Sequence, residues 1–196
     1  MSGSISGGKA TLSIGHSAAL GDDFSGASGT YILATPTDGP NTNEKSGLWS
    51  LDLSTGTPAV GLNLPTLPDG WVYEGWVVID GTPVSTGRFT QVDRADIAAP
   101  YSGPESGPPF PGEDFLVNAP EGLTFPGNIV GNVAVISVEP DPDDSPAPFA
   151  LKPLLGAIPE DATDHLNYSI GTAAVFPQGT ATIDSGELSK MIEANG

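Results

Sequence analysis

Short runs in which hydrophobic and polar residues alternate recur along the chain, and this period of two is typical of β-strands. The strongest run is residues 71–79, where apolar side chains occupy most positions on both faces. A strand of this kind is covered on both sides, so it should lie at the centre of a sheet. Asp80-Gly81, a dipeptide typical of tight turns, then leads into residues 82–89. The pattern therefore predicts a central hairpin made of these two segments.

Further short strands are predicted on either side of this hairpin. Residues 30–34 and 48–53 are expected to pair as a hairpin with a long loop. Residues 132–139 form another clear strand, and residues 172–176 and 180–183 are predicted to form a final hairpin. The remaining candidate strands are residues 9–14, 60–64, 115–117 and 149–151.

Glycine and proline interrupt these runs throughout the chain, with 26 glycines and 20 prolines. Residues 98–131 are so rich in both that an ordered but irregular loop is expected, and long connections of this kind often carry function. A helix is indicated only near the end, where Asp184 precedes Glu187 as a helix cap does and Leu188, Met191 and Ile192 form one apolar stripe.

These elements predict an all-β fold, specifically a two-sheet antiparallel β-sandwich of short strands with long Pro/Gly-rich loops and one short C-terminal helix. A closed barrel is the alternative. The predicted organisation is a flexible leader at residues 1–8, a single sandwich domain at residues 9–183, and a C-terminal helix or tail at residues 184–196.

The charge balance excludes several partners. Six Lys and Arg face 24 Asp and Glu, which gives a formal net charge of −18. A surface of that sign repels a phosphate backbone and an anionic lipid surface, so nucleic acid is not an expected partner. No apolar run reaches the roughly 20 residues of a membrane helix, so direct membrane insertion of this segment is not expected. The chain has no cysteine, which removes disulfides and thiolate chemistry.

Catalytic candidates are few, and we expect a protein that is not an enzyme. His16 precedes Ser17 without the rest of a nucleophile-elbow motif, and His165 lies in a polar segment, so both are interpreted as surface residues. Glu74 is the carboxylate whose apolar neighbours could raise its pKa, but the favoured interpretation is that it faces solvent or pairs with a cation such as Arg88. A hydrolase that uses Glu74 or His16 is therefore a weaker alternative.

Two acidic clusters could hold calcium through oxygen ligands, and no other cofactor is indicated. Solvated turns are the simpler interpretation of both clusters. Their residues are Asp141, Asp143 and Asp144 in one, and Asp22 and Asp23 in the other.

Aromatic residues supply the binding candidates. Tyr101, Phe110, Phe115 and Phe125 lie in the long loop, where they could contact a ligand or another protein. The tryptophans could form a stacking platform for sugars, although their position inside apolar strands favours core packing. These tryptophans are Trp49, Trp71 and Trp76.

Two stretches resemble the ectodomain of membrane-anchored anti-sigma factors of the anti-sigma-K type. The first is Tyr73-Glu74-Gly75-Trp76-Val77-Val78 followed by residues 81–89, which is similar to a Tyr-x-x-Trp strand, a small-residue turn and a Gly-x-Phe strand. The second is the valine-rich segment 133–140 that ends in Glu-Pro, continued by Ser145-Pro146-Ala147-Pro148. The resemblance extends over about residues 57–155, and the chain would be a divergent or free-standing relative.

The resemblance implies an extracytoplasmic β-sandwich that senses a condition or a partner while a cytoplasmic segment holds a sigma factor. The expected function is thus a non-enzymatic sensor or interaction domain that binds a protein or small ligand at the cell surface, in the periplasm or as a secreted protein. A structural or adhesive surface module, stabilised by calcium, is the alternative. The sequence leaves the oligomeric state open.

Overall fold

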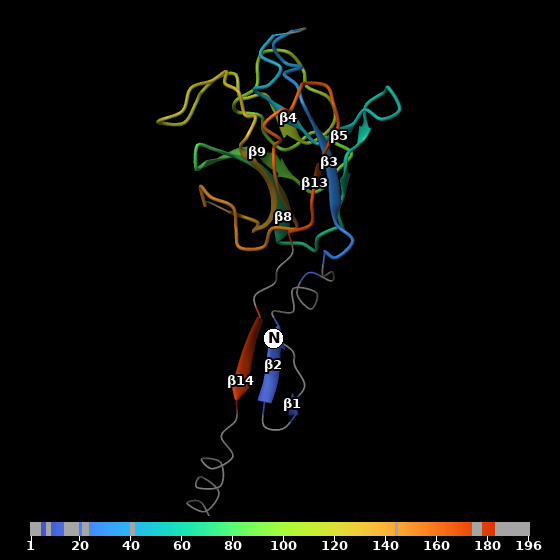
Figure 1. Ribbon diagram of the computed structural model, residues 1–196, viewed down its shortest axis with the longest axis vertical. Coiled ribbons are helices and arrows are strands. Elements are labelled where there is room, and N and C mark those ends of the chain that lie inside the picture. Colours follow the sequence, from blue (N-terminus) through green and yellow to red (C-terminus); the bar gives the residue numbers. More distant parts are fainter. Residues whose placement is uncertain are drawn as a thin grey trace, which may run out of the picture. The chain divides into compact units, whose positions relative to one another are not determined.

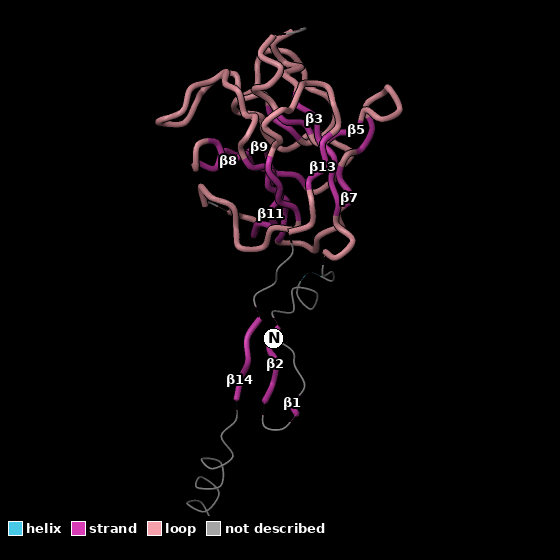
Figure 2. Tube along the Cα trace, in the orientation of Figure 1, coloured by secondary structure: helices cyan, strands magenta, loops and turns pink. Residues whose placement is uncertain are grey.

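A computed structural model describes residues 5–6, 9–13, 20, 24–39, 42–143, 145–173 and 178–182. The described chain is built from strands and loops, which confirms the all-β prediction (Figures 1 and 2). Its contacts group into two compact units, a large one from Phe24 to Ala174 and a small one from Met1–Asp23 with Val175–Gly196. The sequence predicted a single domain over residues 9–183.

The central sheet of the large unit is antiparallel and has the strand order β12-β11-β8-β9. Its two middle strands are buried along most of their length, because apolar residues occupy both faces of β8. Asp80 and Gly81 both have positive φ, at 50° and 83°, as the turn between two adjacent strands requires. The predicted central hairpin is therefore confirmed. The strands are β8 (Trp71–Ile79), β9 (Thr82–Phe89), β11 (Val133–Pro140) and β12 (Leu154–Ala157).

A second sheet in the large unit has the order β10-β4-β3-β13, with β7 also paired to β3. Ile32 of β3 lies opposite Trp49 of β4, which confirms the predicted pairing across a long loop. A separate two-stranded ribbon joins β5 to β6. The bounds are β3 (Ser28–Leu33), β4 (Leu48–Trp49), β5 (Leu51–Asp52), β6 (Ala59–Val60), β7 (Leu62–Asn63), β10 (Gly112–Glu113) and β13 (Tyr168–Ile170).

The two sheets meet at one edge, where the residues that follow β13 are hydrogen-bonded to β12 and to Pro153 just before it. Leu155 donates its backbone N–H to the Gly171 carbonyl at 3.0 Å, and Ala173 donates to Pro153 at 3.0 Å. Packing around Gly29 of β3 is close, since a Cβ there would lie 2.4 Å from the side chain of Ile170, its partner on β13, and 3.0 Å from that of Leu154 on β12 in the other sheet. The large unit is therefore sandwich-like, and hydrogen bonds join its two sheets along one edge.

The small unit is a three-stranded antiparallel sheet in the order β1-β2-β14. These strands are β1 (Ile5–Ser6), β2 (Lys9–Ser13) and β14 (Gln178–Thr182). The sequence pattern placed β14 in a hairpin with residues 172–176, but β14 pairs with β2, so that Gln178 lies opposite Ser13. Thr172 instead bridges to Leu154 of β12. Alternation identifies a strand but not its partner, and here the partner is near the other end of the chain.

Two predicted strands are loops. Phe115 has a φ of 50°, which is incompatible with the strand expected at residues 115–117, and β10 lies just before it. Residues 149–151 make one backbone hydrogen bond, from Val138 to the Leu151 carbonyl at 2.9 Å, and the returning strand is β12. The predicted leader is described only at β1, and the predicted C-terminal helix lies outside the described residues.

Candidate functional site: an acidic cleft at one edge of the central sheet

A cleft of about 610 Å³ opens at one edge of the central sheet. Its lining comes from residues 64–73, residues 90–93 and Asp141, and we call it the acidic cleft. Trp71 lies opposite Pro140, and Tyr73 lies opposite Phe89, so the start of β8 and the ends of β9 and β11 share this edge. Antiparallel pairing therefore brings together three segments that are distant in sequence.

The floor of the cleft is apolar and firmly held. Tyr73 is buried, its ring stacks on Phe89 with a centroid distance of 5.6 Å, and its hydroxyl donates a hydrogen bond to the Pro65 carbonyl at 2.6 Å. Trp71 is half-buried, and its ring lies 6.4 Å from that of Phe149. Of the Tyr73 and Trp71 rings, only that of the half-buried Trp71 retains surface that a ligand could cover.

Three carboxylates surround this floor. Asp69, Asp93 and Asp141 are all exposed and come from the three different segments. Within the described residues no hydrogen bond or ion pair engages any of these three carboxylates, and no lysine or arginine lines the cleft. The Asp141 backbone N–H donates to the Gly70 carbonyl at 2.9 Å, which fixes the end of β11 to the segment before β8. Among the described residues the cleft is therefore a negatively charged site without a counter-ion of its own.

Glu74 is buried in the central strand, with 7% of its surface exposed. Ser85 donates its hydroxyl to Glu74 Oε1 at 2.6 Å, and Arg88 lies opposite Glu74 in the strand register without a close ion pair. The expectation that Glu74 faces solvent is therefore wrong, because the strand is covered on both faces. Burial raises the pKa of Glu74, the Ser85 hydroxyl opposes this, and the Glu139 charge adds to it.

A buried pair of neighbouring carboxylates, Glu113 and Asp114, anchors the long loop. The Asp114 carboxylate accepts hydrogen bonds from the Trp49 indole at 2.6 Å and from the Thr37 backbone at 2.8 Å. The Glu113 carboxylate accepts from the backbone N–H of Tyr101 at 3.1 Å and of Asp114 at 2.9 Å. Burial raises the pKa of both groups. Sequence analysis missed this pair, because an acidic dipeptide inside an irregular loop has no periodic signal.

Glu139 is the third fully buried carboxylate. Ser137 lies between Glu139 and Trp76, since it accepts the Trp76 indole N–H at 2.8 Å and donates to Glu139 Oε1. The Phe149 backbone N–H also donates to Oε1, at 2.8 Å, whereas Oε2 has no hydrogen-bond partner among the described residues. These hydrogen bonds connect the loop that follows β11 to the centre of the sheet.

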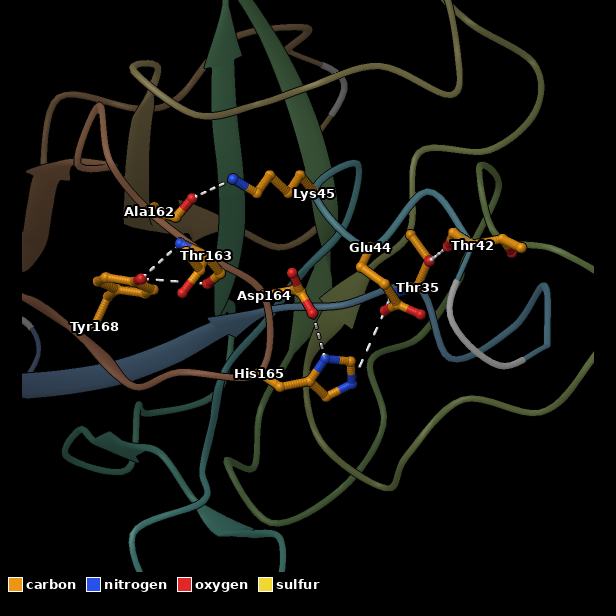
Figure 3. A network of polar contacts seen from close by, with 9 residues as sticks. All are labelled: Thr35, Thr42, Glu44, Lys45, Ala162, Thr163, Asp164, His165 and Tyr168. Carbon is orange, nitrogen blue, oxygen red and sulfur yellow. Dashed lines mark hydrogen bonds and ion pairs between the residues drawn. The ribbon is translucent and has the colours of Figure 1, made fainter.

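A separate polar network surrounds His165, as Figure 3 shows. The imidazole lies between two carboxylates, with Nδ1 3.1 Å from Asp164 Oδ2 and Nε2 3.9 Å from Glu44 Oε2. The hydrogen bond from His165 lowers the pKa of the Asp164 carboxyl. Nearby, Lys45 donates to the Ala162 carbonyl at 2.6 Å, so two loops are joined here. The interactions connect loops at the surface, and no nucleophile is placed against the imidazole among the residues drawn in Figure 3.

Three of the four aromatic candidates lie together. The rings of Tyr101, Phe115 and Phe125 have centroid distances of 5.3–6.0 Å. Phe115 is fully buried, whereas the other two are half-buried. Phe110 lies elsewhere, in a core cluster with Trp49. Their role in ligand binding stays a prediction, and none of the four lines the acidic cleft.

The structure describes some of the remaining candidate site residues. Asp141 is at the cleft, and Asp143 is half-exposed and accepts the Ser145 backbone N–H at 3.0 Å. Among the described residues no three acidic, His or Cys side chains are grouped to hold a metal ion. Of the tryptophans, Trp49 and Trp76 pack in the core as predicted. The candidates that lie outside the described residues are His16, Asp22, Asp23 and Asp144.

No helix in the described part of the chain has the length and apolar character that crossing a membrane requires. Comparisons with family models, with curated proteins and with solved structures gave no match to the chain. The proposal for the function therefore rests on the geometry of the acidic cleft.

Proposed function

We propose that the chain is a non-enzymatic sensor or interaction domain that works outside the cytoplasm, and that its acidic cleft binds a positively charged, extended segment of a partner protein. The observation that carries this proposal is the set of three unpaired carboxylates, Asp69, Asp93 and Asp141, above the aromatic floor. Carboxylates without internal partners are free to pair with cations of a ligand, and apolar side chains of that ligand can cover Trp71.

The shape of the cleft supports a peptide more than a compact small molecule. The cleft is open to solvent and is bounded on one side by segment 64–68, which contains two prolines and belongs to no strand. Buried aromatic surface supplies affinity in such interfaces, whereas surrounding charges mainly determine the association rate and the choice of partner. Binding at this edge is thus expected to weaken as the salt concentration rises.

The location outside the cytoplasm is supported by the resemblance of residues 71–89 and 133–148 to anti-sigma factor ectodomains. In a sensor of that kind, binding at the cleft would alter what the domain reports to a tethered cytoplasmic segment. The genomic context tests this part separately: a complete gene with neither a membrane anchor nor a neighbouring sigma-factor gene would overturn the signalling role.

The cleft is tested by nuclear magnetic resonance titration of the labelled protein with a synthetic peptide of alternating Lys and Leu. Shifts should concentrate on the Trp71 indole and on the amides of residues 69–72 and 90–93. A triple variant, Asp69→Asn, Asp93→Asn and Asp141→Asn, should weaken binding about tenfold or more, which corresponds to about 1.4 kcal/mol.

The matched control removes three carboxylates that do not line the cleft, namely Glu105→Gln, Glu121→Gln and Asp161→Asn. Equal weakening in both triple variants would show that the peptide senses only the net charge, and would overturn the proposal. A peptide of alternating Glu and Leu that binds as well would do the same.

A further inference from the structure

One wall of the acidic cleft leads directly to a carboxylate that is largely buried. Thr90, Gln91 and Asp93 are exposed at the cleft, whereas Asp96, three residues later, is turned into the protein. Ile97 then donates its backbone N–H to the Arg88 carbonyl of β9 at 2.8 Å. We call residues 90–97 the wall segment. The position of the wall segment therefore depends on the contacts of the Asp96 side chain.

Asp96 is packed between two strands that belong to different sheets. Its Oδ2 atom accepts the backbone N–H of Gly112, in β10, at 3.1 Å. On its other side the Asp96 side chain lies against Gly87 of β9. A Cβ added to Gly87 would be 2.3 Å from Asp96 Oδ2. Gly87 has a φ of +113°, so glycine is required there for both the backbone and the space. Asp96 therefore joins the edge of the central sheet to the second sheet and holds the wall segment in place.

The charges around Asp96 are unfavourable for a carboxylate. From β10 it faces Glu113, whose own oxygens already accept hydrogen bonds from Tyr101, Asp114 and Ser102. From β9 it faces Gly87, while the charge of the neighbouring Arg88 acts on Glu74.

The remaining nearby groups give Asp96 no counter-charge. Asp93 and Arg94 of the wall segment are exposed, and Tyr101 of the long loop is influenced by Glu113 and Glu74. In the large unit Lys45 and Lys152 are bonded to backbone carbonyls elsewhere. No cation of the described residues is therefore paired with Asp96.

We propose that Asp96 is a pH-dependent switch of the acidic cleft: the neutral carboxyl keeps the wall segment docked on Gly87 and Gly112, and the ionised carboxylate releases it. Docking of a neutral carboxyl preserves the hydrogen bond from Gly112, because its carbonyl oxygen is still an acceptor. Ionisation adds a second buried negative charge beside Glu113, and moving Asp96 into water relieves that repulsion. Release of the wall segment removes residues 90–93 from their place in the cleft.

The pH range follows from the environment of Asp96. Burial, followed by the charge of Glu113, raises the pKa of Asp96 to about 7, against the opposing effect of the Gly112 hydrogen bond. The docked form thus prevails at mildly acidic pH, and the wall segment is released as the pH rises through about 7. The use of this switch rests on the proposed function of the cleft, but its operation can be measured without any ligand.

Amide hydrogen exchange tests the switch, because the N–H groups of Ile97 and Gly112 report the two contacts of the wall segment. After correction for the intrinsic exchange rate, protection of both should fall about tenfold or more between about pH 6 and about pH 8. The amides of Ile129 and Gly131, bonded to Lys45 and Ile158, should keep their protection. In Asp96→Asn, which retains the acceptor without the charge, protection of Ile97 and Gly112 should not depend on pH.

The wild-type protein alone also provides a test, since the carboxyl carbon of Asp96 can be titrated by nuclear magnetic resonance. The midpoint of that titration should coincide with the loss of protection. Protection that is constant with pH in wild type, or a pH dependence that persists in Asp96→Asn as it should in the control Asp161→Asn, would overturn the switch.

The link to the cleft has its own readout, the affinity for the Lys/Leu peptide. It should fall about fivefold or more from about pH 6 to about pH 8 in wild type and stay constant in Asp96→Asn. Responsive amides together with a peptide that never binds would overturn the proposed function and leave the switch standing. Responsive amides with an affinity that is constant with pH would overturn the control of the cleft by Asp96.

Discussion

The Tyr73 hydroxyl donates a hydrogen bond to the Pro65 carbonyl at 2.6 Å, and this contact joins the proline-containing side of the acidic cleft to its floor. Pro65 precedes the central strand by several residues and has no sheet partner of its own. The position of this side of the cleft therefore depends on a side chain whose ring is fixed by stacking on Phe89.

Tyr73→Phe should keep the ring stacking and remove this hydrogen bond. The expected loss in the free energy of unfolding is about 1 kcal/mol, together with weaker binding of the Lys/Leu peptide. Urea unfolding and the peptide titration measure the two effects. Tyr168→Phe is the control, because its half-exposed hydroxyl is bonded to Thr163 away from the cleft. An affinity unchanged in Tyr73→Phe would show that Pro65 is held by other contacts.

Ser137→Ala should destabilise the protein by about 2–4 kcal/mol, because it leaves the buried Trp76 indole N–H without a partner and removes one of the two hydrogen bonds to Glu139 Oε1. Ser145→Ala removes an exposed hydroxyl that bonds the Ala147 carbonyl, and should cost less than about 0.5 kcal/mol. Chemical denaturation of both variants gives the comparison. Equal small losses would mean that the buried network contributes little to stability.

Gly87→Ala and Gly122→Ala separate backbone strain from close packing. Both glycines have positive φ, at +113° and +86°, but only Gly87 has a neighbour, Asp96, in the place of a Cβ. Gly122→Ala should cost about 1–2 kcal/mol for strain alone. Gly87→Ala should cost more and should also lower the exchange protection of Ile97. A Gly87→Ala variant no less stable than Gly122→Ala would contradict the packing of Asp96 on β9.

Stability should fall as the pH rises from about 4 to about 7, because burial raises the pKa of Asp96 to about 7 while the unfolded carboxyl ionises near 3.8. Below that range both states hold the proton, and within it only the unfolded state loses it. The stabilising contribution is therefore complete at acidic pH and lost as the pH passes through about 7. Glu74, Glu113 and Asp114 act in the same direction, since burial raises the pKa of each.

Asp96→Asn should flatten this dependence by about 1–3 kcal/mol, after allowance for solvent screening of a partly exposed group. Denaturant unfolding at several pH values measures it. A wild-type stability that rises over the same interval would contradict the sign of the effect.

His165→Gln should change the free energy of unfolding by less than about 0.5 kcal/mol, since exposed pairs with carboxylates contribute little. The imidazole lies against Asp164 and Glu44 at the surface. Thermal or chemical unfolding tests this expectation. A loss of several kcal/mol would show that the loops of Figure 3 depend on the imidazole itself.

The parts of the fold that sequence could predict are those in which pairing is local. Alternation and the Asp80-Gly81 turn together predict the β8–β9 hairpin, because a tight turn places two consecutive strands side by side. The strand β13 was missed, since three residues are too few for a periodic signal. The pairing of β14 with β2 was missed because a strand pattern carries no information on a distant partner.

The acidic cleft, likewise, could be predicted from the sequence only in part. Its central strand was predicted, but Asp69, Asp93 and Asp141 are separated by more than a strand length and meet only through the sheet register. Asp96 was missed for a different reason. An aspartate in a polar, turn-rich stretch predicts exposure, and its burial depends on the absence of a side chain at Gly87.

The hydrogen bond from the Thr172 hydroxyl to the Ala27 carbonyl, at 2.7 Å, brings the two ends of the large unit together. Before the large unit folds, pairing of Ser13 with Gln178 has to close a loop that contains most of the chain, and the entropic cost of closure grows with loop length. Once the large unit has formed, only chain segments 14–26 and 173–177 separate the hydrogen-bonded Ala27 and Thr172 from β2 and β14 in the sequence. The small sheet is therefore expected to assemble late in folding, after the large unit has shortened the loop that remains to be closed.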